Sequence, residues 1–248
     1  MTSMTTDDAL DCLPHQVCLA SESEITDANN QPYLATDTVH STGEACAGRG
    51  EVWLRGVNVS AGYYKMGELT RSDFDAQGWF HTGDIGMLTP GGAIKIIDRK
   101  KNLVKLKGGE YVALERMNTA YNSSPYVNVE VGGTCCFADD SLDRAVAIMQ
   151  IKPPELAALA TELGLSGKSD AELCGHAQVQ AKVLESFKQC AKTAKLTALE
   201  TVVAVLPVVV EWATANGCLT ATQKLVPKKV FAFHAKELEV LKAQGRRG

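Results

Sequence analysis

The sequence predicts an α+β fold, with strand-like segments before residue 100 and alternating strands and helices after it. Alternating polar and apolar residues, as at residues 51–55, are typical of strands with one buried face. Apolar residues three or four positions apart, as at Leu156, Leu159 and Leu163, are typical of amphipathic helices. Because strands and helices interleave in the second half, we expect a small mixed sheet covered by helices there.

The first hundred residues are rich in turns and are predicted to contain only short strands. Val52 and Leu54 share one face of a half-buried segment that Gly56 ends, and Pro90 opens a turn before another apolar segment. Strands are therefore expected at residues 17–20, 33–35, 51–55 and 93–97.

The second half shows both periodicities. Strands are expected at residues 127–137, 144–151 and 202–206. Helices are expected to begin at residues 111–118 and to cover residues 156–163, 179–194 and 228–242. A loop at residues 164–170 separates the two middle helices.

The overall charge argues against a surface that attracts nucleic acid. The chain has 248 residues, 45% of them hydrophobic, and a formal net charge of −4. Without an overall basic field, we expect no nucleic-acid partner, and any phosphate chemistry must depend on local residues.

The cysteines and the apolar segments suggest an intracellular location, cytoplasmic or peripherally associated with a membrane. Eight cysteines form no Cys-x-x-Cys pair and no zinc-binding spacing, so we expect buried free thiols in a reducing compartment and no protein-bound metal. Asp7 and Asp8 stand where a secretory or mitochondrial leader would be basic and apolar. The longest apolar stretch, residues 202–210, is too short to span a bilayer and contains Pro207.

Residues 164–169 (GLSGKS) look like a phosphate-binding loop but do not fit its pattern. That loop needs four residues between its glycines, whereas Gly164 and Gly167 have two between them. The segment also follows a predicted helix rather than a strand, so we do not expect it to bind a nucleotide.

The segment GWFHTGD at residues 78–84 is the most informative in the chain. Taken alone, it could be an aromatic turn. It follows GEVWLRG (residues 50–56) and GYY (residues 62–64), and it precedes DRKK (residues 98–101). This ordered series resembles the acyl-adenylate-forming enzymes, which include acyl-CoA synthetases, luciferases and the adenylation domains of peptide synthetases. The resemblance runs from about Val17 to Phe231.

Two further segments resemble the eukaryotic long-chain fatty acyl-CoA synthetases in particular. They are LVKLKGGEYVALE (residues 103–115) and LTATQKL (residues 219–225). The resemblance implies that residues 1–100 are the β-rich end of a large AMP-binding domain and that residues 101–248 are a small, mobile α/β lid domain. On composition alone, the five basic residues within 98–107 would suggest only a solvated strand or turn.

The resemblance also implies an adenylate-binding site. It assigns Asp84 to the ribose hydroxyls, which a carboxylate can accept in bidentate fashion, and Arg99 to ribose and phosphate oxygens, which suit its planar fork. Thr82 belongs to the same AMP- and ATP-binding segment.

The resemblance makes Lys224 the catalytic residue of the first half-reaction, in which a carboxylate attacks the α-phosphate of ATP. A lysine between these two anions lowers the barrier electrostatically. Lys101 matches the hinge of the lid domain. Lys105, Gly108 and Gly109 match the loop that replaces Lys224 for thioester formation, where glycine lets the backbone approach the pantetheine arm of coenzyme A.

The reactants implied are a fatty acid, ATP with Mg²⁺ and coenzyme A, although no metal ligand can be identified in this sequence. The phosphate loop, the adenine-binding motif and the fatty-acid tunnel of the family cannot be found either. Two hypotheses follow: a carboxyl-terminal fragment of a long-chain fatty acid–CoA ligase, or a non-catalytic remnant that binds adenylate or pairs with another synthetase chain.

Overall fold

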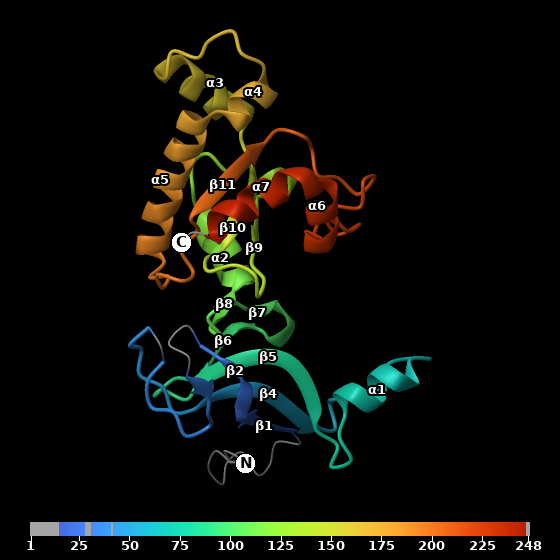
Figure 1. Ribbon diagram of the computed structural model, residues 1–248. Helices are drawn as coiled ribbons and strands as arrows, with labels where there is room; N and C mark the ends of the chain where they lie inside the picture. Colours follow the sequence, from blue (N-terminus) through green and yellow to red (C-terminus); the bar gives the residue numbers. More distant parts are fainter. Residues whose placement is uncertain (1–14, 28–30, 41, 247–248) are drawn as a thin grey trace. The chain divides into compact units, whose positions relative to one another are not determined.

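The computed structural model describes residues 15–27, 31–40 and 42–246 and divides the chain into two compact units at Leu103/Val104. Both units combine helices and strands (Figure 1). The absence of a leader, inferred from residues 1–10, concerns residues outside the described part. The seven described cysteines are free and buried, as expected.

The first unit is built on a four-stranded antiparallel sheet. Its strand order is β1 (His15–Ala20), β4 (Arg49–Gly56), β5 (Phe80–Leu88) and β6 (Ile94–Arg99). Leu19, Val52 and Leu88 form a small apolar cluster on it. A second, two-stranded sheet pairs β2 (Glu22–Thr26) with β3 (Pro32–Tyr33), while α1 (Gly67–Asp73) and the 3₁₀ turn Lys100–Asn102 complete the unit.

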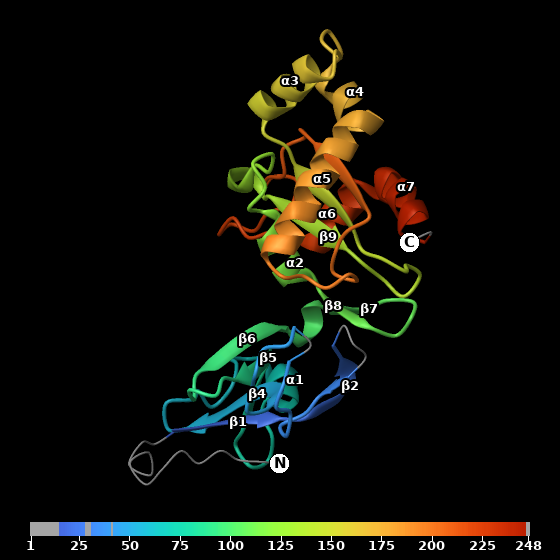
Figure 2. The same cartoon turned by 90° about the vertical axis from the view of Figure 1, so that its left-hand side faces the viewer.

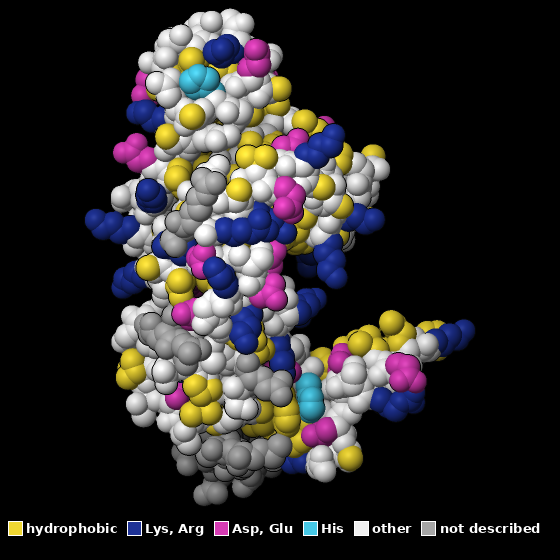
Figure 3. All heavy atoms as spheres, in the orientation of Figure 1, with side chains coloured by type: hydrophobic (Ala, Val, Ile, Leu, Met, Phe, Trp, Pro, Cys, Tyr) yellow, Lys and Arg dark blue, Asp and Glu magenta, His cyan; other side chains and the backbone are white. Residues whose placement is uncertain are grey.

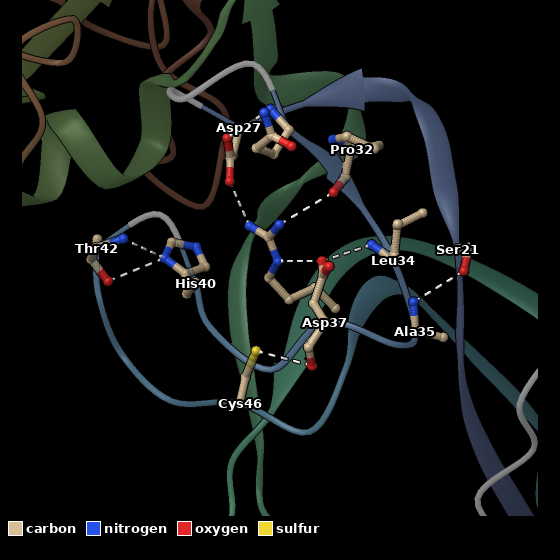
Figure 4. A network of polar contacts seen from close by, with 11 residues as sticks. Ser21, Asp27, Pro32, Leu34, Ala35, Asp37, His40, Thr42 and Cys46 are labelled. Carbon is tan, nitrogen blue, oxygen red and sulfur yellow. Dashed lines mark hydrogen bonds and ion pairs between the residues drawn. The ribbon is translucent and has the colours of Figure 1, made fainter.

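A buried arginine ties the loop after β2 to the large sheet (Figure 4). Arg49, at the start of β4, donates from Nη1 to Asp27 Oδ2 at 2.6 Å and from Nε to Asp37 Oδ2 at 2.7 Å. Its Nη2 donates to the Pro32 carbonyl at 3.2 Å. Removing either carboxylate would leave a buried charge partly uncompensated, so this network fixes the loop on β4.

The second unit contains a mixed three-stranded sheet with helices packed on it (Figure 2). The strand order is β11 (Ala204–Val208), β10 (Val146–Gln150) and β9 (Thr134–Phe137); β10 is parallel to β11 and antiparallel to β9. This confirms the predicted small mixed sheet. A hairpin of β7 (Leu103–Lys105) and β8 (Tyr111–Ala113) precedes it.

The helices of this unit cover the sheet and share one core with it. α2 (Leu114–Tyr121) packs on β9, α5 (Ala177–Thr193) on β11, and α7 (Ala235–Gly245) on β10 and β11. Tyr121 and Phe187 stack within this core at a ring-centroid distance of 4.6 Å. The Tyr121 hydroxyl donates to the Glu200 carbonyl at 2.8 Å and accepts from the Val202 amide at 3.0 Å, so the buried hydroxyl is fully partnered.

Most strands lie close to their predicted positions, but three predicted boundaries are wrong. The strand expected at residues 127–137 begins only at Thr134, because Val129–Val131 form a 3₁₀ turn that ends at Gly132 with a left-handed φ of 112°. The helix expected from residue 111 begins at Leu114, after the short strand β8. The strand expected at residues 33–35 ends at Tyr33.

The helical regions also differ in detail. α3 (Pro153–Glu162) is as expected, but a short helix α4 (Asp170–Gly175) follows the loop. Ser169 caps α4, with a capping box to Glu172, so the phosphate-loop look-alike ends in a helix cap. The last helix is two helices, α6 (Pro227–Phe233) and α7, which meet at His234.

Candidate functional site

The antiparallel register of β5 and β6 places Asp84 directly opposite Arg99. The Arg99 Nε donates to Asp84 Oδ1 at 2.9 Å, and the two side chains are 50% and 28% exposed. The pair therefore orients the guanidinium while leaving its remaining N–H groups and one carboxylate oxygen accessible to a ligand.

The backbone around Asp84 is fixed by its neighbours on β5 and β4. The Thr82 hydroxyl donates to the Val52 carbonyl at 2.7 Å and accepts from the Asp84 amide at 3.0 Å. Gly83, with a φ of 71°, donates its amide to Glu51 Oε1 at 3.0 Å. A side chain at position 83 would be strained by that φ, which explains the glycine between Thr82 and Asp84.

An open cavity of about 650 Å³ lies beside this pair and belongs entirely to the first unit. Thr82 and three consecutive basic residues, Arg99, Lys100 and Lys101, line it. Lys100 binds Glu22 at 2.5 Å and lies 3.6 Å from Glu51, and these carboxylates, acting against burial, raise its pKa. Lys100 is thus held as a cation at the cavity wall.

Two residues of the cavity were not singled out from the sequence. His81 stacks flat on Trp53, with ring centroids 3.9 Å apart, and its Nε2 lies 3.6 Å from Asp75 Oδ2. Tyr63 donates its hydroxyl to Asp73 Oδ2 at 3.1 Å. The available signal was their aromatic character within the motifs at residues 62–64 and 78–84. Their partners Asp73 and Asp75 lie close to these motifs in the sequence, but only the fold shows which residues pair.

Lys224 lies in the second unit, in an exposed turn between β11 and α6. Its amide donates to the Thr220 hydroxyl oxygen at 3.0 Å, and its carbonyl accepts from the Thr220 amide at 2.8 Å. Gln223, before it, has a φ of 60°. The turn therefore has a defined backbone that presents the lysine to solvent.

Lys105 ends β7, and Gly108 and Gly109 lie in the loop that joins β7 to β8. The Leu106 amide donates to the Glu110 carbonyl at 2.8 Å, and the Gly109 amide donates to the Leu106 carbonyl at 2.9 Å. A Cβ atom at Gly108 would lie 2.3 Å from Glu110 Oε2. The flexible Glu110 side chain therefore occupies the space that a side chain at position 108 would need.

The predicted site residues thus fall into two groups. Thr82, Asp84, Arg99 and Lys101 belong to the first unit, where all but Asp84 line the cavity. Lys224 and the Gly108 loop belong to the second unit. Within residues 15–27, 31–40 and 42–246, no group of three or more His, Cys, Asp or Glu side chains could hold a metal ion, and no helix is long and apolar enough to cross a membrane.

Comparisons with known proteins find close relatives among curated sequences. The chain is 36% identical over 198 residues to long-chain-fatty-acid–CoA ligase 1 of Schizosaccharomyces pombe, a match that covers 79% of this chain and 29% of the relative. Against the peroxisomal long chain acyl-CoA synthetase 6 of Arabidopsis thaliana it is 36% identical, covering 83% and 28%. It is also 36% identical to human long-chain-fatty-acid–CoA ligase 6, a match that covers 79% of this chain and 28% of the relative.

The chain belongs to the long-chain fatty acyl-CoA ligase family. It spans about three tenths of the length of the curated relatives it matches. No protein-family model matches it.

Two solved structures are similar to this chain over most of its length. The adenylation domain of a carboxylate reductase from Mycobacterium chelonae has a TM-score of 0.73 and 26% identity, covering 93% of this chain and 31% of that one. The A domain of a carboxylic acid reductase from Segniliparus rugosus, in complex with AMP and a co-purified carboxylic acid, has a TM-score of 0.71 and 25% identity. That match covers 93% of this chain and 32% of the other. The mixed α/β architecture of this ligase-family chain is therefore that of adenylate-forming proteins.

Proposed function

We propose that the chain forms the carboxyl-terminal part of an ATP-dependent acid–thiol ligase that converts a long-chain fatty acid, ATP and coenzyme A into acyl-CoA, AMP and diphosphate. The observation that carries this proposal is the 36% identity to ligases of a yeast, a plant and a human over about four fifths of the chain. The chemistry divides into adenylation of the fatty acid and transfer of the acyl group to the thiol.

In this proposal, the first unit contributes the ribose and phosphate contacts of the adenylate. Asp84 accepts from the ribose hydroxyls, and Arg99, oriented by Asp84 at 2.9 Å, donates to ribose and phosphate oxygens. Thr82 fixes the backbone beneath them. Arg99 and Lys101 at the cavity support a phosphate-bearing ligand there, whereas Glu22 and Glu51 already balance the charge of Lys100.

We further propose that residues 1–100 are the end of the large AMP-binding domain and that residues 101–248 are a mobile lid, with Lys101 as the hinge. The division into two compact units at Leu103/Val104, two residues past Lys101, supports this arrangement. After adenylation, rotation of the lid exchanges Lys224 for the loop of Lys105, Gly108 and Gly109. Its glycines then admit the pantetheine arm of coenzyme A.

Other reactants and surroundings follow from the same proposal. Mg²⁺ would arrive with ATP, because the described residues offer no cluster of ligands for it. The buried free cysteines support a reducing, intracellular compartment, cytoplasmic or at a membrane surface. In the alternative, a non-catalytic remnant, the chain would bind adenylate or pair with another synthetase chain as an interaction module.

A segment exchange tests the proposal. This sequence replaces the matching part of ligase 1 of S. pombe, and the resulting full-length enzyme is assayed for acyl-CoA and AMP formation from palmitate, ATP and coenzyme A. We expect ATP-dependent acyl-CoA formation. A folded exchange protein, shown by a cooperative thermal transition, that forms neither acyl-adenylate nor acyl-CoA would overturn the proposal and favour a non-catalytic remnant.

A further inference from the structure

The turn that carries Lys224 is the end of a longer connection, which we call the Lys224 loop and define as residues 213–226. It makes up most of the connection from β11, which ends at Val208, to α6, which begins at Pro227 (Figure 1). Its ends are paired with each other, because the Val226 amide donates to the Cys218 carbonyl at 2.8 Å and Leu219 bridges Leu225. The Asn216 side chain closes the first turn through the Ala213 and Cys218 amides. The loop is thus one compact body whose position depends on what anchors it.

One anchor is apolar and lies beneath the loop at Gly132. A Cβ atom built at Gly132 would lie 2.7 Å from Trp212 Cε3, 3.4 Å from Leu225 Cδ1 and 3.5 Å from Leu219 Cδ2. Because Gly132, where φ is 112°, has no side chain, Trp212 and both leucines of the loop can pack against the backbone before β9. Leu219 is buried and Leu225 half-buried, so this contact seats the loop.

The second anchor is polar and buried. The Trp212 Nε1 donates to His234 Nε2 at 3.0 Å, and the two residues are 1% and 4% exposed. Accepting at Nε2 requires the neutral imidazole with its proton on Nδ1. His234 is the residue at which α6 ends and α7 begins, with φ of −107° and ψ of 32°, outside the helical range. The break between the two helices thus coincides with the histidine that binds Trp212.

We propose that Trp212 and His234 are positioning residues for Lys224, which hold the Lys224 loop at the geometry that adenylation requires. The inference rests on the proposed function, because it concerns how Lys224 is aimed. Trp212 immediately precedes the loop, contacts Gly132 beneath it, and is fixed by a bond that α6 and α7 supply. Because Lys224 itself is exposed, its direction is set by the backbone of the loop rather than by packing of its own side chain.

Misplacing Lys224 should affect one half-reaction and not the other. An electrostatic group contributes to a transition state only when it is held in place, and a misplacement of about 1 Å can cost on the order of 10²-fold in rate. Thioester formation does not use Lys224 in the proposed mechanism. We call the hydrogen bond between Trp212 and His234, with the packing of Trp212 on Gly132, the clamp. Loosening the clamp should therefore slow adenylation and leave thioester formation largely unchanged.

Amide hydrogen exchange on the chain itself tests the clamp without any assay of activity. His234→Leu leaves the Trp212 N–H without its acceptor, whereas His234→Gln offers an amide oxygen in its place. We expect exchange of the Thr220 and Val226 amides to speed up about tenfold or more in His234→Leu, the scale of leaving one buried donor unpaired, and to recover in His234→Gln. Val240→Ala, on the exposed face of α7, serves as the matched control and should change neither amide.

Unchanged exchange in His234→Leu would overturn the clamp. If His234→Leu unfolds the chain, Trp212→Phe, which removes the donor and keeps an aromatic ring, gives the same test without a stranded N–H.

The half-reactions then test what the clamp is for, in the full-length exchange protein. We expect adenylation of palmitate to fall about tenfold or more in His234→Leu, thioester formation from supplied palmitoyl-adenylate to stay within about twofold, and His234→Gln to restore adenylation. An equal loss in both steps would mean that Trp212 and His234 only stabilise the fold, and would overturn the proposal. If the unmutated segment-exchange enzyme is inactive, that result counts against the proposed function. Amide hydrogen exchange on the chain itself still tests the clamp in that case.

Discussion

At the scale of single residues, the account depends most on the pair of Asp84 and Arg99. In the full-length exchange protein, Asp84→Asn should raise the KM for ATP by roughly ten- to a hundredfold, since a hydrogen bond to a charged group contributes about 1.5–3 kcal/mol. Glu68→Gln, on exposed α1, is the control and should not change it. An unchanged KM in Asp84→Asn would show that the carboxylate does not bind the ribose.

His234 gives a second residue-scale prediction, concerning pH and stability. Burial lowers the pKa of His234 from its ordinary value, although Glu237 acts in the opposite direction. The unfolded chain then binds a proton at a higher pH than the folded chain, so this contribution to stability is complete above about pH 6.5 and is lost as the pH falls through that value.

We therefore expect the free energy of unfolding to decrease between pH 7 and pH 5.5, by at most about 1.4 kcal/mol per pH unit from this one proton. Urea unfolding at both pH values measures it. His234→Gln should flatten the dependence, and an equally steep dependence in that variant would assign it to other groups.

At the scale of elements, Gly132 allows the connection before β9 to pack under Trp212. Gly132→Ala should lower the free energy of unfolding by about 1–3 kcal/mol more than Gly167→Ala does, because overpacking adds to backbone strain. Both glycines have positive φ, 112° and 92°, but a Cβ at Gly167 meets no atom within 4 Å. Denaturant unfolding compares the two, and equal losses would contradict the contact.

The elements also show what the sequence can and cannot reveal. Helix α3 was predictable because its leucines report one buried face, and β10 because a short apolar run is typical of a strand buried on both faces. Strand β4 was predictable from the alternation of Val52 and Leu54, although its burial decreases along the strand. The missed elements include β2, α1 and α4, which are short, and α1 buries no residue, so its sequence carries no period to detect. The nine-residue strand β5 was also missed, because its sequence FHTGDIGML contains two glycines and no regular alternation of polar and apolar residues. The split at His234 depends on a contact with Trp212, 22 residues earlier, which local pattern does not encode.

The candidate site also combines residues that the sequence predicts with contacts that it does not predict. Its motif residues, Thr82, Asp84 and Arg99, could be predicted because the family resemblance marks their positions. Their structural partners could not: Lys100 meets Glu22 from 78 residues away, and the Trp53–His81 stack depends on the register of β4 and β5. Long-range pairings of this kind are set by the tertiary fold.

At the scale of the whole molecule, two compact units joined near Leu103 predict a protease-sensitive junction. Lys101, Lys105 and Lys107 are exposed there and offer sites for trypsin. Limited digestion should cut first between residues 98 and 110 and leave two resistant fragments, identified by mass spectrometry. Degradation of both flanks while this segment stays intact would indicate one rigid domain.

In the proposed mechanism, Lys224 and the Gly108 loop serve different half-reactions of one ligase. In the full-length exchange protein, Lys224→Ala should lower adenylation by roughly 10²- to 10³-fold, the effect of removing one preorganised electrostatic group, and spare thioester formation from supplied acyl-adenylate. Gly108→Leu should do the reverse, because its side chain would block the pantetheine path.

The decisive measurement is therefore the rate of each half-reaction in both variants, with Gly167→Ala as the control for a glycine substitution on the surface of the same unit. We expect opposite patterns of loss, with adenylation reduced in Lys224→Ala and thioester formation reduced in Gly108→Leu. Equal slowing of both steps in Lys224→Ala, or a loss mainly of adenylation in Gly108→Leu, would contradict the proposed mechanism.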